Sequence, residues 1–185
     1  DYLGFIFYEK SKRNFEGVIP KLPKSIKKTG VFVNEYVEIL VSLVEEYQLE
    51  AIQLHGDESV DYINEVKNHL PKIEVIKVFG IKDEFDFDIL KSYEEDVDYF
   101  LFDTKGKERG GNGITFNWKV LENYTSTKPF FLSGGIGLEQ TKDIQEIRKT
   151  DLPIYALDVN SQFEIEGGLK SVEKLKQFKA NVYGK

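Results

Sequence analysis

Cysteine and methionine are both absent from the 185 residues of the sequence. Without cysteine, these residues form no disulfide and offer no thiolate for catalysis or metal binding. No apolar run approaches the roughly 20 residues that a membrane-spanning helix requires. No basic and then apolar leader opens the chain. These absences predict a cytoplasmic protein with no membrane partner.

Positive charge is also in short supply, because 25 lysines and arginines face 32 aspartates and glutamates, a formal net charge of -7. An acidic protein of this kind is a poor match for nucleic acid or for an anionic membrane. Any phosphate that it binds must therefore be held by local groups. The apolar share of 41% is ordinary for a globular protein. With no linker or low-complexity stretch, we expect one domain over residues 1–185.

Short apolar segments alternate with longer amphipathic ones along the whole sequence. Strands are expected at residues 2–7, 29–33, 51–55, 74–79, 99–103, 129–133 and 154–158. Helices are expected at residues 35–47, 58–70, 84–93, 139–148 and 170–179. Asn34 is the expected N-cap of the first helix. Such alternation implies parallel strands joined by right-handed crossovers, in either a doubly wound sheet or a (β/α) barrel.

The start of the chain favours the barrel. A barrel of this class needs eight strands, and one more βα unit of roughly 20–30 residues would complete it. The sequence opens with "DYLGFIFY", with no initiator methionine and already inside an apolar strand. We therefore expect an α/β fold, a (β/α)8 TIM barrel whose first strand and helix are missing from this chain.

Four expected strands end in a polar residue, namely His55, Asp103, Ser133 and Asp158. In barrels, the active site is built at the C-terminal ends of the strands. Strand alternation puts Gln53 and His55 on one face, so both are candidates for the barrel mouth. Each residue also has a plain structural interpretation: a carboxylate can cap a loop, and a lone histidine can serve the fold.

Glycine-rich stretches follow the last two expected strands. In "LSGGIG", Gly134 and Gly135 allow backbone N–H groups to approach a phosphate, although a tight turn explains them as well. The stretch "DVNSQFEIEGG" supplies a second loop. Phosphate sites built from the loops after strands seven and eight recur in barrels. The two loops together favour a phosphate site.

These stretches resemble those of the phosphoribosylanthranilate isomerase family. The matching segments are "GFIFYEKSKR", "GVFVNE", "AIQLHGDE", "FDTKGKERGGNGITFNW", "LSGGI" and "ALDVNSQFE...GGLK". The resemblance implies an Amadori rearrangement of N-(5-phosphoribosyl)anthranilate in tryptophan biosynthesis, with no metal and no organic cofactor. It also implies a phosphorylated small molecule as the partner, and it leaves monomer and homodimer both open.

The resemblance also implies roles for individual residues. Asp103 matches the family's general acid, and the glycine-rich loop after it is expected to fold over the substrate. Arg13 matches the arginine that holds the anthranilate carboxylate, a planar task that suits a guanidinium. The remaining matches are the phosphate-loop and substrate-proximal residues, Gln53, His55, Gly134, Gly135, Asp158, Asn160 and Ser161.

Two departures from the family pattern stand out. Where the family often reads D-V-S-S-G-V-E, this sequence has Asn160 and Gln162, so Gln162 must avoid the backbone conformation that favours glycine. The family's general base is a cysteine in a "K-x-C-G" stretch of the first strand, which this chain lacks. We therefore expect the natural protein to carry that strand upstream.

Two other interpretations stay open. Indole-glycerol-phosphate synthase and a histidine-pathway isomerase share the phosphate loops, but the former uses strand-end lysines and the latter a pair of aspartates. Lys77 lies within its expected strand without a matching motif. A barrel that binds a sugar phosphate or a partner protein without catalysis is the third interpretation, supported only by the missing cysteine.

Overall fold

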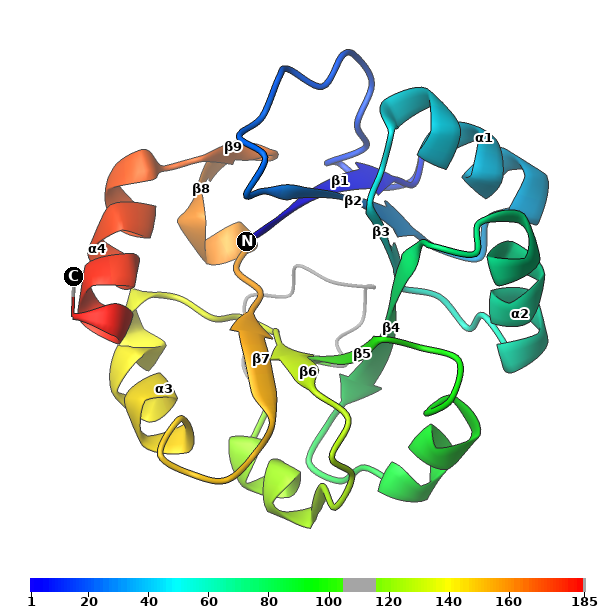
Figure 1. Ribbon diagram of the computed structural model, residues 1–185. Coiled ribbons are helices and arrows are strands. Elements are labelled where there is room, and N and C mark those ends of the chain that lie inside the picture. Colours follow the sequence, from blue (N-terminus) through cyan, green and yellow to red (C-terminus); the bar gives the residue numbers. More distant parts are fainter. Residues whose placement is uncertain (105–115, 185) are drawn as a thin grey trace. The chain divides into compact units, whose positions relative to one another are not determined.

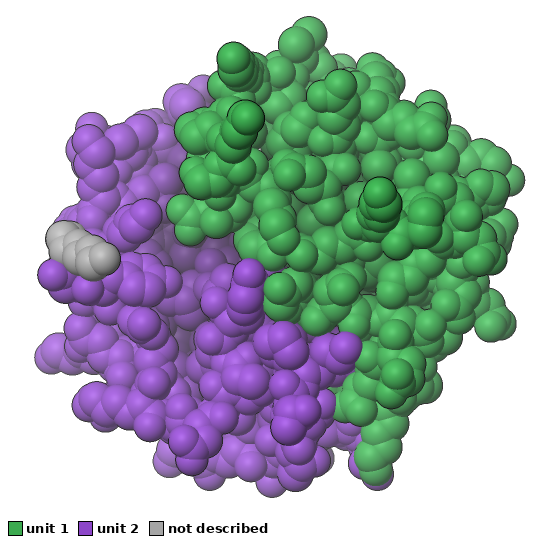
Figure 2. Space-filling model, in the orientation of Figure 1, with its two compact units in different colours: residues 1–78, 89–99 green, residues 79–88, 100–185 purple. Residues whose placement is uncertain are grey.

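The computed structural model describes residues 1–104 and 116–184. The chain comprises two compact units, coloured separately in Figure 2. Unit 1 comprises Asp1–Val78 and Ile89–Tyr99, and unit 2 comprises Phe79–Asp88 and Phe100–Lys185. The single domain over residues 1–185 stays a prediction. The loop expected to close over substrate, residues 105–115, lies outside the described residues.

Unit 1 is built on parallel strands paired in chain order. They are β1 (Tyr2–Phe7), β2 (Lys27–Phe32), β3 (Ala51–Leu54) and β4 (Glu74–Ile81), whose last residues enter unit 2. All four predicted strands of this region are confirmed, and their ends move by no more than two residues. The apolar runs set these positions because the strand interiors are buried: Ile52 and Leu54 are fully enclosed.

Two helices of unit 1 lie side by side against its strands, as Figure 1 shows. They are α1 (Val37–Tyr47) and α2 (Val60–His69). Each buries one face, with Leu40 and Val44 in α1 and Ile63 and Val66 in α2. Residues at spacings of three and four share a helix face, so the predicted amphipathic pattern is confirmed here.

The predicted N-cap at Asn34 is wrong. The helix begins at Val37 with Tyr36 in the cap position, and no side chain caps it. Asn34 instead adopts a left-handed backbone with φ of 50°. Its side-chain oxygen accepts the backbone N–H of Asp57 at 2.7 Å. Asparagine tolerates this conformation better than most residues, and the side chain serves a neighbouring loop rather than the helix.

The predicted helix at residues 84–93 is also wrong. Only a short 3-10 helix forms, η1 (Phe87–Ser92). Asp86 starts it, because its side chain accepts the backbone N–H of Asp88 at 3.0 Å. Phe85 and Phe87 place their rings edge-on to each other, 5.0 Å apart. Local turn chemistry and aromatic packing therefore replace the longer helix.

Unit 2 repeats the parallel arrangement. β5 (Tyr99–Thr104), β6 (Phe130–Leu132) and β7 (Ile154–Leu157) pair in chain order, as predicted. The helical segments after β5 are η2 (Trp118–Asn123), η3 (Leu138–Gln140), α3 (Thr141–Ile147), η4 (Ser161–Phe163) and α4 (Val172–Tyr183). A small antiparallel hairpin of β8 (Glu164–Glu166) and β9 (Leu169–Lys170) was not predicted. Helices α3 and α4 lie side by side in Figure 1.

The core of unit 2 is aromatic. Phe102 is fully buried, and its ring contacts those of Phe87, Tyr124 and Phe130 at centroid distances of 6.0, 5.5 and 4.9 Å. The contacts with Phe87 and Tyr124 are edge-to-face, a geometry that adds to the gain from burying apolar area. Because side chains alternate along a strand, this packing fixes which face of β5 carries the next residue, Asp103.

Candidate functional site

Gln53 and His55 lie together at the C-terminal end of β3. The backbone N–H of His55 donates to the carbonyl of Phe32 at 2.8 Å, which continues the pairing of β3 with β2. The Gln53 amide nitrogen lies 3.1 Å from Nδ1 of His55. The predicted shared face is confirmed.

Arg13 lies in a compact turn that follows β1. The side chain of Asn14 accepts the backbone N–H of Tyr8 at 2.9 Å, and the backbone N–H of Arg13 donates to Oγ of Ser11 at 3.1 Å. The chain then returns to the strand, where the N–H of Phe15 donates to Ile6 at 2.7 Å. This turn holds the half-buried Arg13 at the C-terminal end of β1.

In unit 2, Asp103, Ser133 and Asp158 follow one another across three neighbouring strands. Backbone bonds from Ser133 to Phe102 (2.9 Å) and from Asp158 to Leu132 (2.8 Å) keep the three ends level. Oγ of Ser133 donates to a carboxylate oxygen of Asp158 at 2.8 Å. Asp103 and Ser133 are buried, at 7% and 6% exposure. Three of the four predicted polar strand ends, Asp103, Ser133 and Asp158, therefore form one row in unit 2.

Gly134 packs directly against the strand end that carries Asp103. A Cβ at Gly134 would lie 2.3 Å from Oγ1 and 2.7 Å from the backbone nitrogen of Thr104, and 3.1 Å from Oδ1 of Asp103. Gly134 and Gly135 also have positive φ angles of 91° and 65°. The close approach requires glycine at position 134, and the positive φ angles favour glycine at both positions. The "SGG" loop thus lies against the candidate acid.

The second predicted loop contains Asn160 and Ser161, which begin η4. The Asn160 side-chain oxygen accepts a hydrogen bond from Nζ of Lys170, which also pairs with Glu164 at 2.5 Å. Lys170 belongs to the matching "GGLK" stretch, but the sequence pattern alone predicts no role for it. Its partner Asn160 lies ten residues away, across the unpredicted hairpin.

Gln162 avoids the glycine conformation, as predicted, because it is not among the described residues with positive φ. The Cβ of Gln162 lies 3.1 Å from the position that a Cβ at Gly137 would take. Gly137 belongs to "LSGGIG", so the two predicted phosphate loops touch within unit 2. The replacement of the family's glycine therefore leaves the two loops packed against each other.

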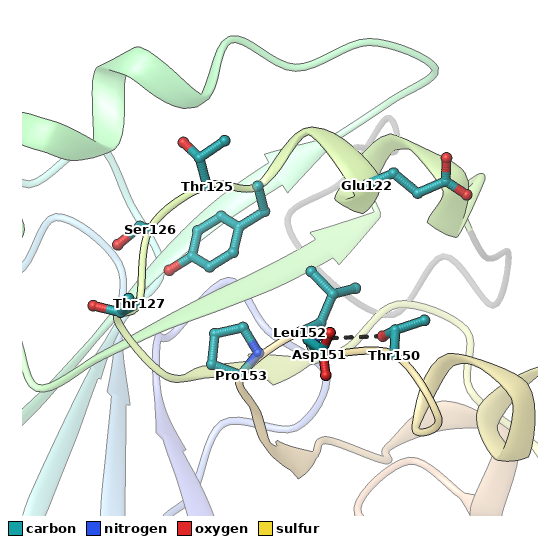
Figure 3. A pocket seen from close by; sticks show the side chains of 9 residues that line it. Glu122, Thr125, Ser126, Thr127, Thr150, Asp151, Leu152 and Pro153 are labelled. Carbon is teal, nitrogen blue, oxygen red and sulfur yellow. Dashed lines mark hydrogen bonds between the residues drawn. The ribbon is translucent and has the colours of Figure 1, made fainter.

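A hollow of about 500 Å³ in unit 2 contains none of the predicted site residues (Figure 3). It is lined by residues 122, 124–127 and 150–153. These segments precede β6 and β7, whereas Ser133 and Asp158 follow the same strands. The hollow therefore lies at the opposite strand ends from the row of polar residues, and we assign it no part in the site.

Within residues 1–104 and 116–184, no three His, Asp or Glu side chains come together as metal ligands. The helices of this described part are too short or too polar to cross a membrane.

The sequence profile of the N-(5'phosphoribosyl)anthranilate (PRA) isomerase family matches residues 1–181. The N-(5'-phosphoribosyl)anthranilate isomerase of Parabacteroides distasonis is 41% identical over 185 residues, which cover 96% of this chain and 81% of the relative. The crystal structure of phosphoribosyl anthranilate isomerase from Thermotoga maritima is 32% identical, with a TM-score of 0.82 over 100% of this chain and 89% of that one.

A second isomerase crystal structure holds reduced 1-(o-carboxyphenylamino)-1-deoxyribulose 5-phosphate. It is 29% identical, with a TM-score of 0.79 over 100% of this chain and 88% of that one. Together with the parallel strands and intervening helices, these likenesses establish an α/β barrel-like fold. The chain belongs to the N-(5'-phosphoribosyl)anthranilate isomerase family.

Proposed function

We propose that this protein isomerises N-(5-phosphoribosyl)anthranilate to 1-(2-carboxyphenylamino)-1-deoxyribulose 5-phosphate, a step of tryptophan biosynthesis. The observation that carries the proposal is the buried Asp103 beside the "SGG" loop, in a chain of this family. The reaction is an Amadori rearrangement, which moves two protons and needs no electron acceptor. That the enzyme needs no metal and no organic cofactor stays a prediction.

Asp103 is the proposed general acid. It protonates the furanose ring oxygen, the C1–O bond breaks, and the nitrogen lone pair forms the C1=N iminium of the open chain. Removal of the C2 proton then gives the enolamine, which settles to the ketone by protonation at C1. Asp103 is suited to the first transfer because it is 7% exposed and Thr104 N–H donates to its Oδ1 at 2.8 Å, which fixes its orientation.

The two ends of the substrate need different groups. The guanidinium of Arg13 presents paired donors to the anthranilate carboxylate, a geometry that an ammonium does not reproduce. Backbone groups near Gly134, Gly135, Asn160 and Ser161 take the phosphate. Local donors have to do this work, since the net charge of -7 repels a phosphate at long range. Gln53 and His55 contact the substrate without a proton-transfer role.

The general base stays a prediction. The resemblance assigns it to a cysteine on a strand before Asp1, and the sequence given has no cysteine. The intact mass of the natural protein tests this. A mass above the 21.4 kDa of these residues, by the roughly 2–3 kDa of one βα unit, is the expected result. The cytoplasmic location also stays a prediction, as does the choice between monomer and homodimer.

The decisive experiment is Asp103→Asn in the full-length protein. Loss of the acid should lower kcat by roughly 10²–10⁴-fold, while the affinity for the reduced product analogue stays close to that of the wild type. An amide keeps the shape of the side chain but cannot donate the same proton. Substantial residual turnover would remove Asp103 from the role of acid, and a wild-type protein without turnover would overturn the proposed function.

A further inference from the structure

A buried ion pair joins Lys77 of β4 to Glu58, which precedes α2. Nζ and Oε2 are 2.9 Å apart, and the two side chains are only 3% and 1% exposed. We propose that Lys77 and Glu58 are positioning residues that hold Gln53 and His55 in place for the substrate. The inference rests on the proposed function, because it takes Gln53 and His55 as substrate contacts.

Lys77 binds the backbone on both sides of His55. Besides Glu58, its Nζ donates to the carbonyl oxygen of Gly56 at 2.8 Å and to that of Leu54 at 3.4 Å. A lysine ammonium has three donors, so one buried cation can fix the residue before His55 and the residue after it. The backbone position of His55 therefore depends on where Lys77 lies.

Glu58 binds the loop from the other side. Its Oε1 accepts the backbone N–H of Asn34 at 2.8 Å and that of Gly56 at 3.0 Å. Asn34 in turn accepts the N–H of Asp57 through its side chain at 2.7 Å. The segment after β2 and the segment after β3 are thus joined through one carboxylate, next to the residue that Lys77 also binds.

Gly56 shows how tightly the loop closes on this carboxylate. A Cβ there would lie 2.2 Å from Oδ1 of Asn34 and 2.5 Å from Oε1 of Glu58. A Cβ at Gly56 would have to displace the side-chain oxygens of Asn34 and Glu58 from these positions. In "QLHG", Gly56 therefore leaves the space that the carboxylate of Glu58 occupies.

Fold stability alone is a poor reason for this arrangement. Two charges must be taken out of water, and well-packed apolar residues of similar size often stabilise a core as well or better. What an apolar pair cannot do is bind the carbonyls of Leu54 and Gly56 and the N–H groups of Asn34 and Gly56. Those contacts act on position, which is what a substrate-binding histidine requires.

The same strands supply a matched control. Lys27 and Glu74 form an ion pair at 2.6 Å, with side chains 41% and 18% exposed. They are the first residues of β2 and β4, so they lie at the N-terminal strand ends, away from His55. Removing this pair changes the same charges in the same unit without touching the loop after β3.

The test compares two double variants of the full-length protein, Lys77→Met/Glu58→Leu and Lys27→Met/Glu74→Leu. The readouts are the Kd for reduced 1-(o-carboxyphenylamino)-1-deoxyribulose 5-phosphate, KM and kcat for phosphoribosylanthranilate, and the unfolding midpoint. The first variant should stay folded but bind the analogue roughly 10- to 100-fold more weakly. The control should bind as the wild type does. A folded first variant with wild-type affinity would overturn the proposal.

Glu58→Asp decides the question if the first double variant does not fold. It keeps the charge and shortens the side chain, so the expected result is a weaker Kd and shifted ring-nitrogen NMR signals for His55. The sequence has two histidines, so the signals of His69, at the far end of α2, are the internal reference. Unchanged His55 signals and an unchanged Kd would refute the positioning role. A wild-type protein that neither binds the analogue nor turns over substrate would instead refute the proposed function.

Discussion

The candidate site residues of the two units are supported in different ways. In unit 1, the loop with His55 is held by charged side chains, with Lys77 and Glu58 bound to backbone groups around it. In unit 2, the loop after β6 packs closely against β5, because Gly134 has no side chain to keep it away from the backbone of Thr104. Charged side chains that bind backbone groups and glycines that let two backbone segments pack closely are two ways to fix the geometry of a site.

The difference matches what each region is proposed to bind. Arg13, Gln53 and His55 are proposed to contact the substrate through side chains, which need support behind them. The loops at Gly134 and Asn160 would hold a phosphate through backbone N–H groups, which are placed by the backbone itself. Variants that add or remove single groups should therefore have distinct effects in the two units.

The largest effect in this comparison is expected from Gly134→Ala. The added Cβ would meet Oγ1 and the backbone nitrogen of Thr104 at 2.3 and 2.7 Å. The loop must therefore shift. Oδ1 of Asp103 lies only 3.1 Å from the added Cβ, so the carboxyl group of Asp103 is displaced as well. A displacement of about 1 Å at a catalytic centre costs on the order of 100-fold. We expect a loss of that size in kcat/KM, measured by steady-state kinetics.

Gly168→Ala is the matched control for this variant. Its φ of 87° is close to the 91° of Gly134, but no atom lies within 4 Å of the position of its Cβ. It should cost only backbone strain, about 1–2 kcal/mol in the free energy of unfolding, and leave kcat/KM unchanged. Equal losses of kcat/KM in the two variants would mean that strain, not the approach to Thr104, explains Gly134.

Arg13→Lys tests the side-chain solution in unit 1. Lysine keeps the charge but not the planar pair of donors. We expect KM for phosphoribosylanthranilate to rise about tenfold, as for the loss of one charge-assisted hydrogen bond, with kcat much less affected. Lys12→Ala, at an exposed neighbour in the same turn, should leave KM as it is. If Arg13→Lys had the wild-type KM, the carboxylate would have to bind elsewhere.

The sequence predicted the strands well because a buried parallel strand is a short apolar run whatever its neighbours are. It placed Asp103, Ser133 and Asp158 correctly at strand ends for the same reason. It failed where the partner is distant in the chain. Lys77 is 19 residues from Glu58, and a lysine inside an apolar run gives no sign that it is paired.

The errors at Asn34 and at residues 84–93 have a related cause. Asparagine before an apolar periodic segment is a common N-cap, but the side chain of Asn34 can satisfy only one set of groups, and Asp57 is the residue that uses it. Segment 84–93 was expected to form a helix, yet Asp86 begins a 3-10 turn. In both places, a specific hydrogen bond decided the structure where general propensity had suggested another.

The smallest effect is expected from Tyr62→Phe, beside the Glu58 network. Burial, and then the charge of Glu58, raise the pKa of Tyr62 above its ordinary value of 10.0. The buried hydroxyl has no hydrogen-bond partner among the described residues. Removing it should leave the free energy of unfolding unchanged at pH 7 or raise it by up to about 1 kcal/mol. Urea unfolding at pH 7 and near pH 11 measures this.

The pH dependence of the free energy of unfolding tests the role of the Tyr62 hydroxyl more directly. The unfolded hydroxyl ionises near pH 10 while the folded one keeps its proton, so wild-type stability is fully present below that pH and declines above it. Tyr62→Phe should lessen the decline. Tyr93→Phe is the contrasting variant, because the Tyr93 hydroxyl donates to the carbonyl of Glu58 at 3.3 Å, and its loss should cost about 1 kcal/mol at pH 7. A loss of about 1 kcal/mol in Tyr62→Phe at pH 7, as large as that expected for Tyr93→Phe, would contradict the absence of a partner for the Tyr62 hydroxyl.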